Sequence, residues 1–177
     1  MKILAIAGSL RAASINAAFC RAAARLATGG LSVEVYAGLA ELPLFNPDLE
    51  TALPARVSEL RSKVAGADAL LIASPEYAHG VTGAMKNALD WLVSFEGFVG
   101  KPVALVNTSP RAHHAYDALA ETLTTMSATI IADASVAIAL LGSCVTEEEM
   151  VRSPQVSSRI LGMLASMRLF LAASGAQ

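Results

Sequence analysis

Hydrophobic residues follow two different spacings along the chain, and each spacing predicts one kind of element. Short, nearly continuous apolar runs are typical of strands that are covered on both faces of a sheet. Elsewhere the apolar residues recur three or four positions apart, which is the spacing of one face of a helix. The predicted strands lie at residues 3–7, 31–36, 69–73, 103–106 and 129–138. The predicted helices lie at residues 15–26, from 54 onward, 85–92, 116–126 and from 154 onward.

The order of these elements predicts the fold class. Strand and helix alternate five times, and such alternation favours a parallel sheet with helices on both faces, joined by right-handed crossovers. The chain has 177 residues, which suits one domain with a full core. The sequence therefore predicts a doubly wound α/β protein with a single domain over residues 1–177.

Composition and charge narrow the possible partners. The net charge of -2, with scattered lysines and arginines, leaves no basic surplus for a nucleic-acid backbone. The longest stretch without a charged residue, 134–146, is shorter than the roughly 18 apolar residues of a membrane span. The N-terminal apolar run is interrupted at Gly8 and Arg11, which disfavours a secretory signal. We therefore expect a cytoplasmic protein with no nucleic-acid and no membrane partner.

The two cysteines, Cys20 and Cys144, lie far apart and form no paired motif. Neither a disulfide framework nor a zinc site is indicated by this spacing. We expect both to be buried thiols, because free cysteine behaves as a small hydrophobic side chain.

The sequence GSLRAASIN, residues 8–16 and here called loop 1, separates the first predicted strand from the first predicted helix. Ligands of doubly wound sheets bind beyond the carboxyl ends of the strands, and the free N–H groups of a helix N-terminus favour anions. Ser9, Ser14, Arg11 and Asn16 add hydroxyl, guanidinium and amide donors. We expect a phosphate monoester here, because the glycine patterns for pyrophosphate and triphosphate are absent. The alternative is a plain turn in which Ser14 caps the helix and Arg11 points to solvent.

A second stretch, SPEYAHGVTGAMKNALDW, follows the third predicted strand. Its first part, residues 74–82, is here called loop 2. Residues 75–82 are expected to line the same crevice as loop 1, because strands one and three flank the point where the strand order reverses. Glycines can bring backbone N–H groups close to a flat ring, and Tyr77 can supply an aromatic wall. The alternative is a surface loop with Tyr77 packed on its own helix. For Lys86 and Asp90 we favour an ordinary surface ion pair.

Together the two stretches resemble the NADPH-dependent FMN reductase family of flavodoxin-like proteins, which includes quinone, chromate and azo-dye reductases. GSLRAASIN matches the family pattern G-S-x-R-x-x-S-x-N at every fixed position, and PEYAHGVTGAMKNALDW matches most of P-E-Y-N-x-x-x-P-G-x-x-K-N-A-x-D-W. The resemblance covers essentially the whole chain. It implies a flavodoxin-like three-layer sandwich with five parallel strands in the order 2-1-3-4-5.

The resemblance also implies roles for the residues of both loops. The four polar side chains of loop 1 would hold the FMN phosphate, and Pro75, Glu76 and Tyr77 would border the isoalloxazine ring, largely through backbone atoms. Two positions depart from the pattern, because Ala78 replaces the usual asparagine and Thr82 the usual proline. The sequence NTSPRAHHA, residues 107–115, replaces a glycine-rich segment. The candidate cofactor-binding residues are Ser9, Arg11, Ser14, Asn16, Pro75, Glu76, Tyr77, Ala78, His79, Gly80 and Ser109.

The activity implied is that of an FMN-dependent NAD(P)H oxidoreductase. A hydride would pass from NADPH or NADH to FMN N5, and then, in a ping-pong mechanism, to a quinone, azo compound, metal oxyanion or free flavin. No catalytic side chain is expected, because the flavin itself carries the chemistry. The alternatives are a flavodoxin-type electron carrier and a non-catalytic FMN-binding regulatory domain.

The three histidines and two phenylalanines leave open questions. His79, His113 and His114 can reach a substrate or can be solvated loop residues, and they make a poor metal set without a carboxylate or thiolate cluster, so no metal is expected. Phe95 and Phe98 are expected either at an exposed dimer contact or in simple edge packing. The family resemblance implies a homodimer or homotetramer.

Overall fold

The centre of the computed structural model is one parallel sheet, and the structure describes residues 1–109, 113–140 and 144–174. The order β2-β1-β3-β6-β7, in which β8 also pairs with β6, confirms the flavodoxin-like order 2-1-3-4-5. The strands are β1 (Lys2–Ala7), β2 (Ser32–Val35), β3 (Ala69–Ala73), β6 (Pro102–Asn107), β7 (Thr129–Ile130) and β8 (Val136–Ala137).

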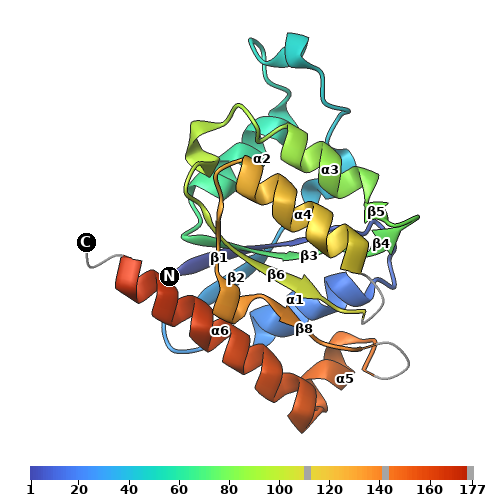
Figure 1. Ribbon diagram of the computed structural model, residues 1–177, viewed down its shortest axis with the longest axis vertical. Coiled ribbons are helices and arrows are strands. Elements are labelled where there is room, and N and C mark those ends of the chain that lie inside the picture. The colour runs from blue at the N-terminus through green and yellow to red at the C-terminus, as the bar shows by residue number, and fades with distance from the viewer. Residues whose placement is uncertain (110–112, 141–143, 175–177) are drawn as a thin grey trace.

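Helices cover both faces of this sheet, as the sequence predicts. One face packs against α1, α5 and α6, and the other packs against α2, α3 and α4 (Figure 1). All five residues of β3 are buried, which explains why its sequence ALLIA is apolar without alternation. The helices are α1 (Ile15–Leu26), α2 (Ala55–Ala65), α3 (Gly83–Asp90), α4 (His113–Thr125), α5 (Glu147–Arg152) and α6 (Pro154–Ser174).

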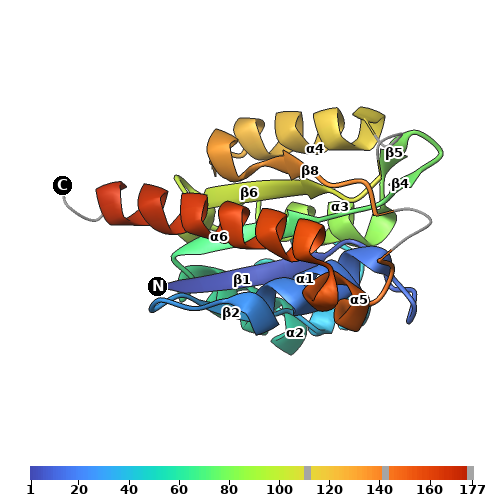
Figure 2. The same cartoon turned by 90° about the horizontal axis from the view of Figure 1, so that it is seen from below.

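The strand register gathers the carboxyl ends of the central strands at one edge. Ala7 of β1 pairs with Ala73 of β3, and Ala73 pairs with Val106 of β6. The chain segments that leave these three strands, including loop 1 and loop 2, therefore begin side by side. The hairpin of loop 2, β4 (Glu76–Tyr77) and β5 (Gly80–Val81), and helix α5 lie at this same end of the sheet (Figure 2).

The continuous strand predicted over residues 129–138 is wrong. The structure divides it into β7, a 3₁₀ turn at Ala132–Ala134 and β8. The turn bulges out of the ladder, and the Ser135 hydroxyl takes the place of a backbone acceptor, because its Oγ accepts a hydrogen bond from Leu105 N at 3.1 Å. Apolar periodicity did not reveal this break, because Asp133 is the only charged residue in an otherwise largely apolar stretch.

Two short elements were absent from the predictions. The hairpin of β4 and β5 was expected to be an irregular loop, and α5 was not expected at all. Helix α5 begins with a capping box in which Thr146 and Glu149 satisfy each other's backbone N–H groups. The sequence TEEE carries that signal. Arg21 of α1 forms an ion pair with Glu147 at 3.2 Å and so holds α5 against α1.

Helix α6 is the one helix in the described part of the chain that is long and apolar enough to cross a membrane, judged by length and composition alone. Within its 18-residue apolar window, 22% of the residues are buried. Its inner side packs into the core on the α1 face of the sheet through Ile160, Met163, Leu164 and Met167.

The structure decides the open alternative for Phe98 and corrects one expectation for a cysteine. Phe98 is only 1% exposed, so it belongs to the core and cannot make a dimer contact as folded, while Phe95 is half-buried beneath the Arg61 guanidinium. Cys20 is buried as predicted, but Cys144 is partly exposed. Cys144 leads into α5 and packs, partly buried, against the core on the α1 face of the sheet.

Candidate active site

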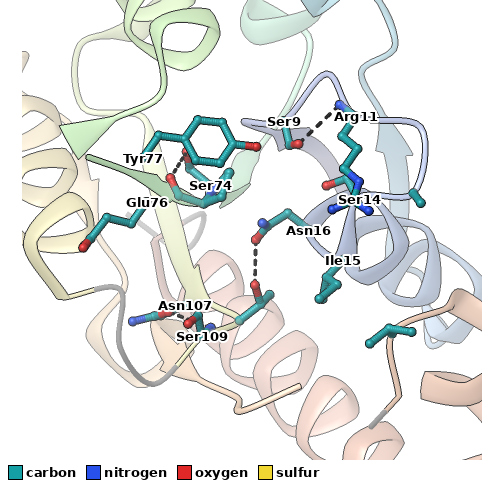
Figure 3. A pocket seen from close by; sticks show the side chains of 14 residues that line it. Ser9, Arg11, Ser14, Ile15, Asn16, Ser74, Glu76, Tyr77, Asn107 and Ser109 are labelled. Carbon is teal, nitrogen blue, oxygen red and sulfur yellow. Dashed lines mark hydrogen bonds between the residues drawn. The ribbon is translucent and has the colours of Figure 1, made fainter. Parts of the chain in front are cut away.

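A cavity of about 550 Å³ opens at the carboxyl ends of β1, β3 and β6 (Figure 3). This volume lies within the usual range of small-molecule sites. Loop 1, loop 2 and the segment after β6 all contribute to its wall, as the family resemblance implies. The cavity is lined by Ser9, Arg11, Ala13, Ser14, Ile15, Asn16, Ser74, Pro75, Glu76, Tyr77, Asn107, Thr108, Ser109 and Val145.

Loop 1 brings its polar side chains to the N-terminus of α1. Ser14 is buried and caps the helix, because its Oγ accepts a hydrogen bond from Ala17 N at 3.2 Å. The backbone N–H of Arg11 donates to Ser9 Oγ at 3.4 Å, and the Arg11 side chain is exposed at the rim. Within the described residues the Arg11 guanidinium has no ion-pair partner. The plain-turn alternative thus describes the Ser14 cap correctly, but it leaves the cavity beside the cap unexplained.

Asn16 is buried at the base of the cavity and is held from the far side by Thr108. The Thr108 hydroxyl donates a hydrogen bond to Asn16 Oδ1 at 2.9 Å, and both side chains are 5% exposed (Figure 3). The engaged oxygen fixes the orientation of the amide, and its Nδ2 remains the available donor. Thr108 was missed in the sequence, where only Ser109 of this segment was a candidate. The polar residues at the end of a buried apolar strand were the signal.

Gly8 is the point where loop 1 approaches loop 2 most closely. A Cβ atom at this position would lie 2.3 Å from Ser74 Oγ and 2.7 Å from Ser74 Cβ. The Gly8 N–H donates to the carbonyl of Ala73 at 2.9 Å, which continues the sheet pairing by one residue. A residue without a Cβ atom is therefore needed at position 8 for loop 1 to lie this close to loop 2.

Loop 2 lines the cavity through Pro75, Glu76 and Tyr77, while Ala78, His79 and Gly80 are not among the lining residues. Ala78 and His79 form the two-residue turn of the hairpin with φ angles of 49° and 59°. Such a turn requires two left-handed residues, which favours asparagine and glycine. The asparagine usual in the family at position 78 would suit this turn better than alanine does. The Tyr77 side chain is 57% exposed rather than packed on its own helix.

The carboxylate of Glu76 turns away from the cavity toward α4. Its Oε2 accepts a hydrogen bond from Ala115 N at 2.9 Å and so caps the helix N-terminus. This hydrogen bond, followed by the neighbouring His114, His79 and His113, lowers the pKa of Glu76 below its ordinary value. Glu76 therefore borders the cavity as an ionised carboxylate that is already engaged elsewhere.

The histidines form a stack beside the hairpin rather than separate loop residues. The rings of His79 and His114 are stacked at 4.5 Å, and those of His113 and His114 lie 3.9 Å apart. His113 and His114 begin α4, which corrects their expected place in a loop, while residues 110–112 of that segment lie outside the described residues. In the described ranges no group of three or more His, Cys, Asp or Glu residues is arranged to hold a metal ion.

Cys20 offers no nucleophile to the site. It lies in α1 on the side that faces the sheet, and burial raises its pKa to about 12. The thiol therefore stays protonated at neutral pH and packs as an apolar side chain.

The donors around the cavity fit a phosphate monoester that carries a flat ring. The helix N-terminus, the Asn16 amide and the unpaired guanidinium of Arg11 favour an anion at one end. At the other end Pro75, Glu76 and Tyr77 line the cavity, and Tyr77 carries an aromatic ring. Fold and cavity together define the class of the protein: a flavodoxin-like α/β protein with a cavity at the carboxyl ends of its strands.

Sequence comparison assigns the family. The family model for NADPH-dependent FMN reductases matches residues 1–140, and the chain belongs to this family. An NAD(P)H-dependent FMN reductase of Pseudomonas aeruginosa is 39% identical over 112 residues, which cover 62% of this chain and 60% of that protein. An NADPH:quinone oxidoreductase of Arabidopsis thaliana is 39% identical over 114 residues, which cover 61% and 58%. The matches thus span about three fifths of these relatives' length.

Solved structures share the fold over a longer range. The NAD(P)H:acceptor oxidoreductase FerB of Paracoccus denitrificans superimposes with a TM-score of 0.78 at 24% identity, covering 97% of each chain. RosB, solved with 8-demethyl-8-formylriboflavin-5'-phosphate, has a TM-score of 0.76 at 19% identity, covering 100% of this chain and 81% of that one. Both likenesses show the flavodoxin-like fold.

Proposed function

We propose that this protein is an FMN-dependent NAD(P)H oxidoreductase that reduces a small acceptor such as a quinone, an azo compound, a metal oxyanion or free flavin. One observation carries the proposal: polar residues of loop 1 and the first residues of loop 2 line one cavity at the carboxyl ends of β1, β3 and β6. Membership of the reductase family and the names of the curated relatives support it.

Each part of the cavity has a task in this function. Ser9, Arg11, Ser14 and the Asn16 amide would hold the phosphate of FMN, at the positive end of the α1 dipole. Pro75 to Tyr77 would border the ring. When bound, FMN supplies the redox chemistry, which is hydride transfer from the nicotinamide to its N5 and from there to the acceptor. The protein then has to bind and orient the reactants, which agrees with a site whose carboxylate, Glu76, is engaged by α4.

The proposal is tested by an anaerobic titration of the FMN-loaded, desalted protein with NADPH, and separately with NADH. The flavin absorption band is followed, and we expect stoichiometric bleaching that a quinone then reverses. A retained band that neither nucleotide bleaches would instead support a flavodoxin-type carrier or a regulatory domain. Failure to retain FMN would contradict the assignment of loop 1.

We also propose that the protein forms a homodimer or homotetramer in the cytoplasm. Val93 and Val99 support self-association, because these apolar side chains are 63% and 67% exposed beside a groove between α3 and α4. The cytoplasmic location agrees with the packing of the inner side of α6 on the sheet, which makes α6 a helix of the core. Light scattering after size-exclusion chromatography tests the assembly, and a monomer at micromolar concentration would contradict it.

A further inference from the structure

Thr82 joins the two loops of the site through a single buried hydroxyl. Its side chain is 4% exposed, and its Oγ1 donates a hydrogen bond to the carbonyl of Gly8 at 2.6 Å. The same oxygen accepts a hydrogen bond from Met85 N at 3.2 Å and thereby caps α3. One hydroxyl thus binds loop 1 and the N-terminus of α3 at once.

Both backbone polar groups of Gly8 are hydrogen-bonded. Its N–H donates to the Ala73 carbonyl at 2.9 Å, and its own carbonyl accepts from Thr82. In a trans peptide the C=O and the following N–H point in opposite directions, so Thr82 also sets the direction of the Ser9 N–H. Ser9 lines the cavity. Thr82 is not part of the cavity wall, but through the Gly8 carbonyl it orients Ser9, the first polar residue of that wall.

We propose that Thr82 is a positioning residue for the phosphate end of the flavin site. Through the Gly8 carbonyl it holds loop 1 in the arrangement that meets the phosphate, and it does so across the boundary between the two loops. This inference rests on the proposed function, since it assumes that the cavity binds FMN. It applies to this chain in particular, because the family pattern usually places a proline here, which has no hydroxyl.

The backbone of Thr82 allows a clean test. Its φ of -61° and ψ of 145° suit valine, serine and proline alike. Thr82→Val and Thr82→Pro remove both hydrogen bonds of the hydroxyl, and Thr82→Ser keeps them. Thr124→Val is the matched control, because Thr124 is exposed and its hydroxyl donates to Ala120 O within α4.

Flavin fluorescence titrations give dissociation constants for FMN and for riboflavin, which lacks the phosphate. We expect Thr82→Val and Thr82→Pro to weaken FMN by about tenfold while riboflavin changes by less than about twofold. Thr82→Ser and Thr124→Val should stay within about twofold of the parent for both ligands. The preference for FMN over riboflavin, rather than overall affinity, is the readout, because a residue that only stabilised the fold would weaken both ligands equally.

The outcomes separate this inference from the proposed function. A parent protein that binds no FMN overturns both. A parent that binds FMN, with an unchanged preference for FMN over riboflavin in Thr82→Val or Thr82→Pro, overturns the positioning role alone. Loss of the α3 cap is seen separately as a lower melting temperature of the apoprotein, and circular dichroism establishes which of the two variants is folded. If neither folds, the same comparison is made with Thr82→Ala, which also removes the hydroxyl: a reduced preference for FMN over riboflavin in that variant supports the role, and an unchanged preference overturns it.

Discussion

Loop 1 and loop 2 meet at one cavity but contribute to it in different ways. In loop 1 the proposed binding groups are side chains, and two of them are held in place, since Ser14 Oγ and Asn16 Oδ1 lie in buried residues and are hydrogen-bonded. In loop 2 the proposed contacts are largely those of the backbone, because the Glu76 carboxylate caps α4 and the Tyr77 ring is mostly exposed. Side-chain recognition leaves a pattern of residue types in the sequence. Recognition by backbone leaves only a pattern of allowed backbone angles.

The largest expected effect concerns the one cation of loop 1. Arg11→Ala should weaken FMN at least about tenfold, because a charge-assisted hydrogen bond contributes roughly 1.5–3 kcal/mol. Fluorescence titration measures this, and Arg21→Ala is the control, since Arg21 lies on the outer face of α1 and pairs with Glu147. Equal affinities in the two variants would remove Arg11 from the phosphate site.

The next effect concerns the contact between the loops. Gly8→Ala should lower the free energy of unfolding by about 1–3 kcal/mol, because the new methyl group overlaps Ser74. Gly83→Ala at the start of α3 meets no atom within 4 Å and should be neutral or gain up to about 1 kcal/mol. Urea denaturation of both variants decides the matter. A Gly8→Ala protein as stable as Gly83→Ala would mean that the loops are not in close contact.

A smaller change in the free energy of unfolding, this time an increase, is expected in loop 2. Ala78→Asn should raise the free energy of unfolding by about 0.5–1 kcal/mol, because asparagine tolerates the left-handed φ of 49° better than alanine. The control is Ala52→Asn, at an exposed position that has no positive φ. Should Ala78→Asn prove no more stable than Ala52→Asn in thermal unfolding, the hairpin turn would not be strained.

The smallest effect appears only as a pH dependence. Because Ala115 N and the nearby histidines lower the pKa of Glu76, ionised Glu76 stabilises the fold above the ordinary glutamate pKa. That contribution is lost as the pH falls through the lowered value. Glu76→Gln should therefore be less stable than the parent near neutral pH, and the difference should vanish in acid. Glu96→Gln, at an exposed glutamate, should follow the parent throughout. Parallel curves for all three proteins would contradict the cap.

The sequence by itself determined the strands and helices in which apolar residues recur at a regular spacing. The spacing of apolar residues predicted the first four strands of the sheet, β1, β2, β3 and β6, and five helices, because burial on one or two faces imposes a period on neighbouring residues. The donors of loop 1 were predicted for a similar reason, since Ser9 to Asn16 lie within one short segment at a helix N-terminus. The order of the sheet came from the family resemblance and not from the periodicity.

The tertiary structure alone decided the contacts that join distant residues. Thr82 and Gly8 are 74 positions apart, and Thr108 and Asn16 are 92 apart. No local spacing predicts which hydroxyl meets which acceptor over such distances. The same holds for Ser135, whose side chain completes the ladder beside Leu105 and lets a 3₁₀ turn divide the last strand. Local periodicity follows from burial, whereas these hydrogen bonds exist only because the packed sheet brings the partners together.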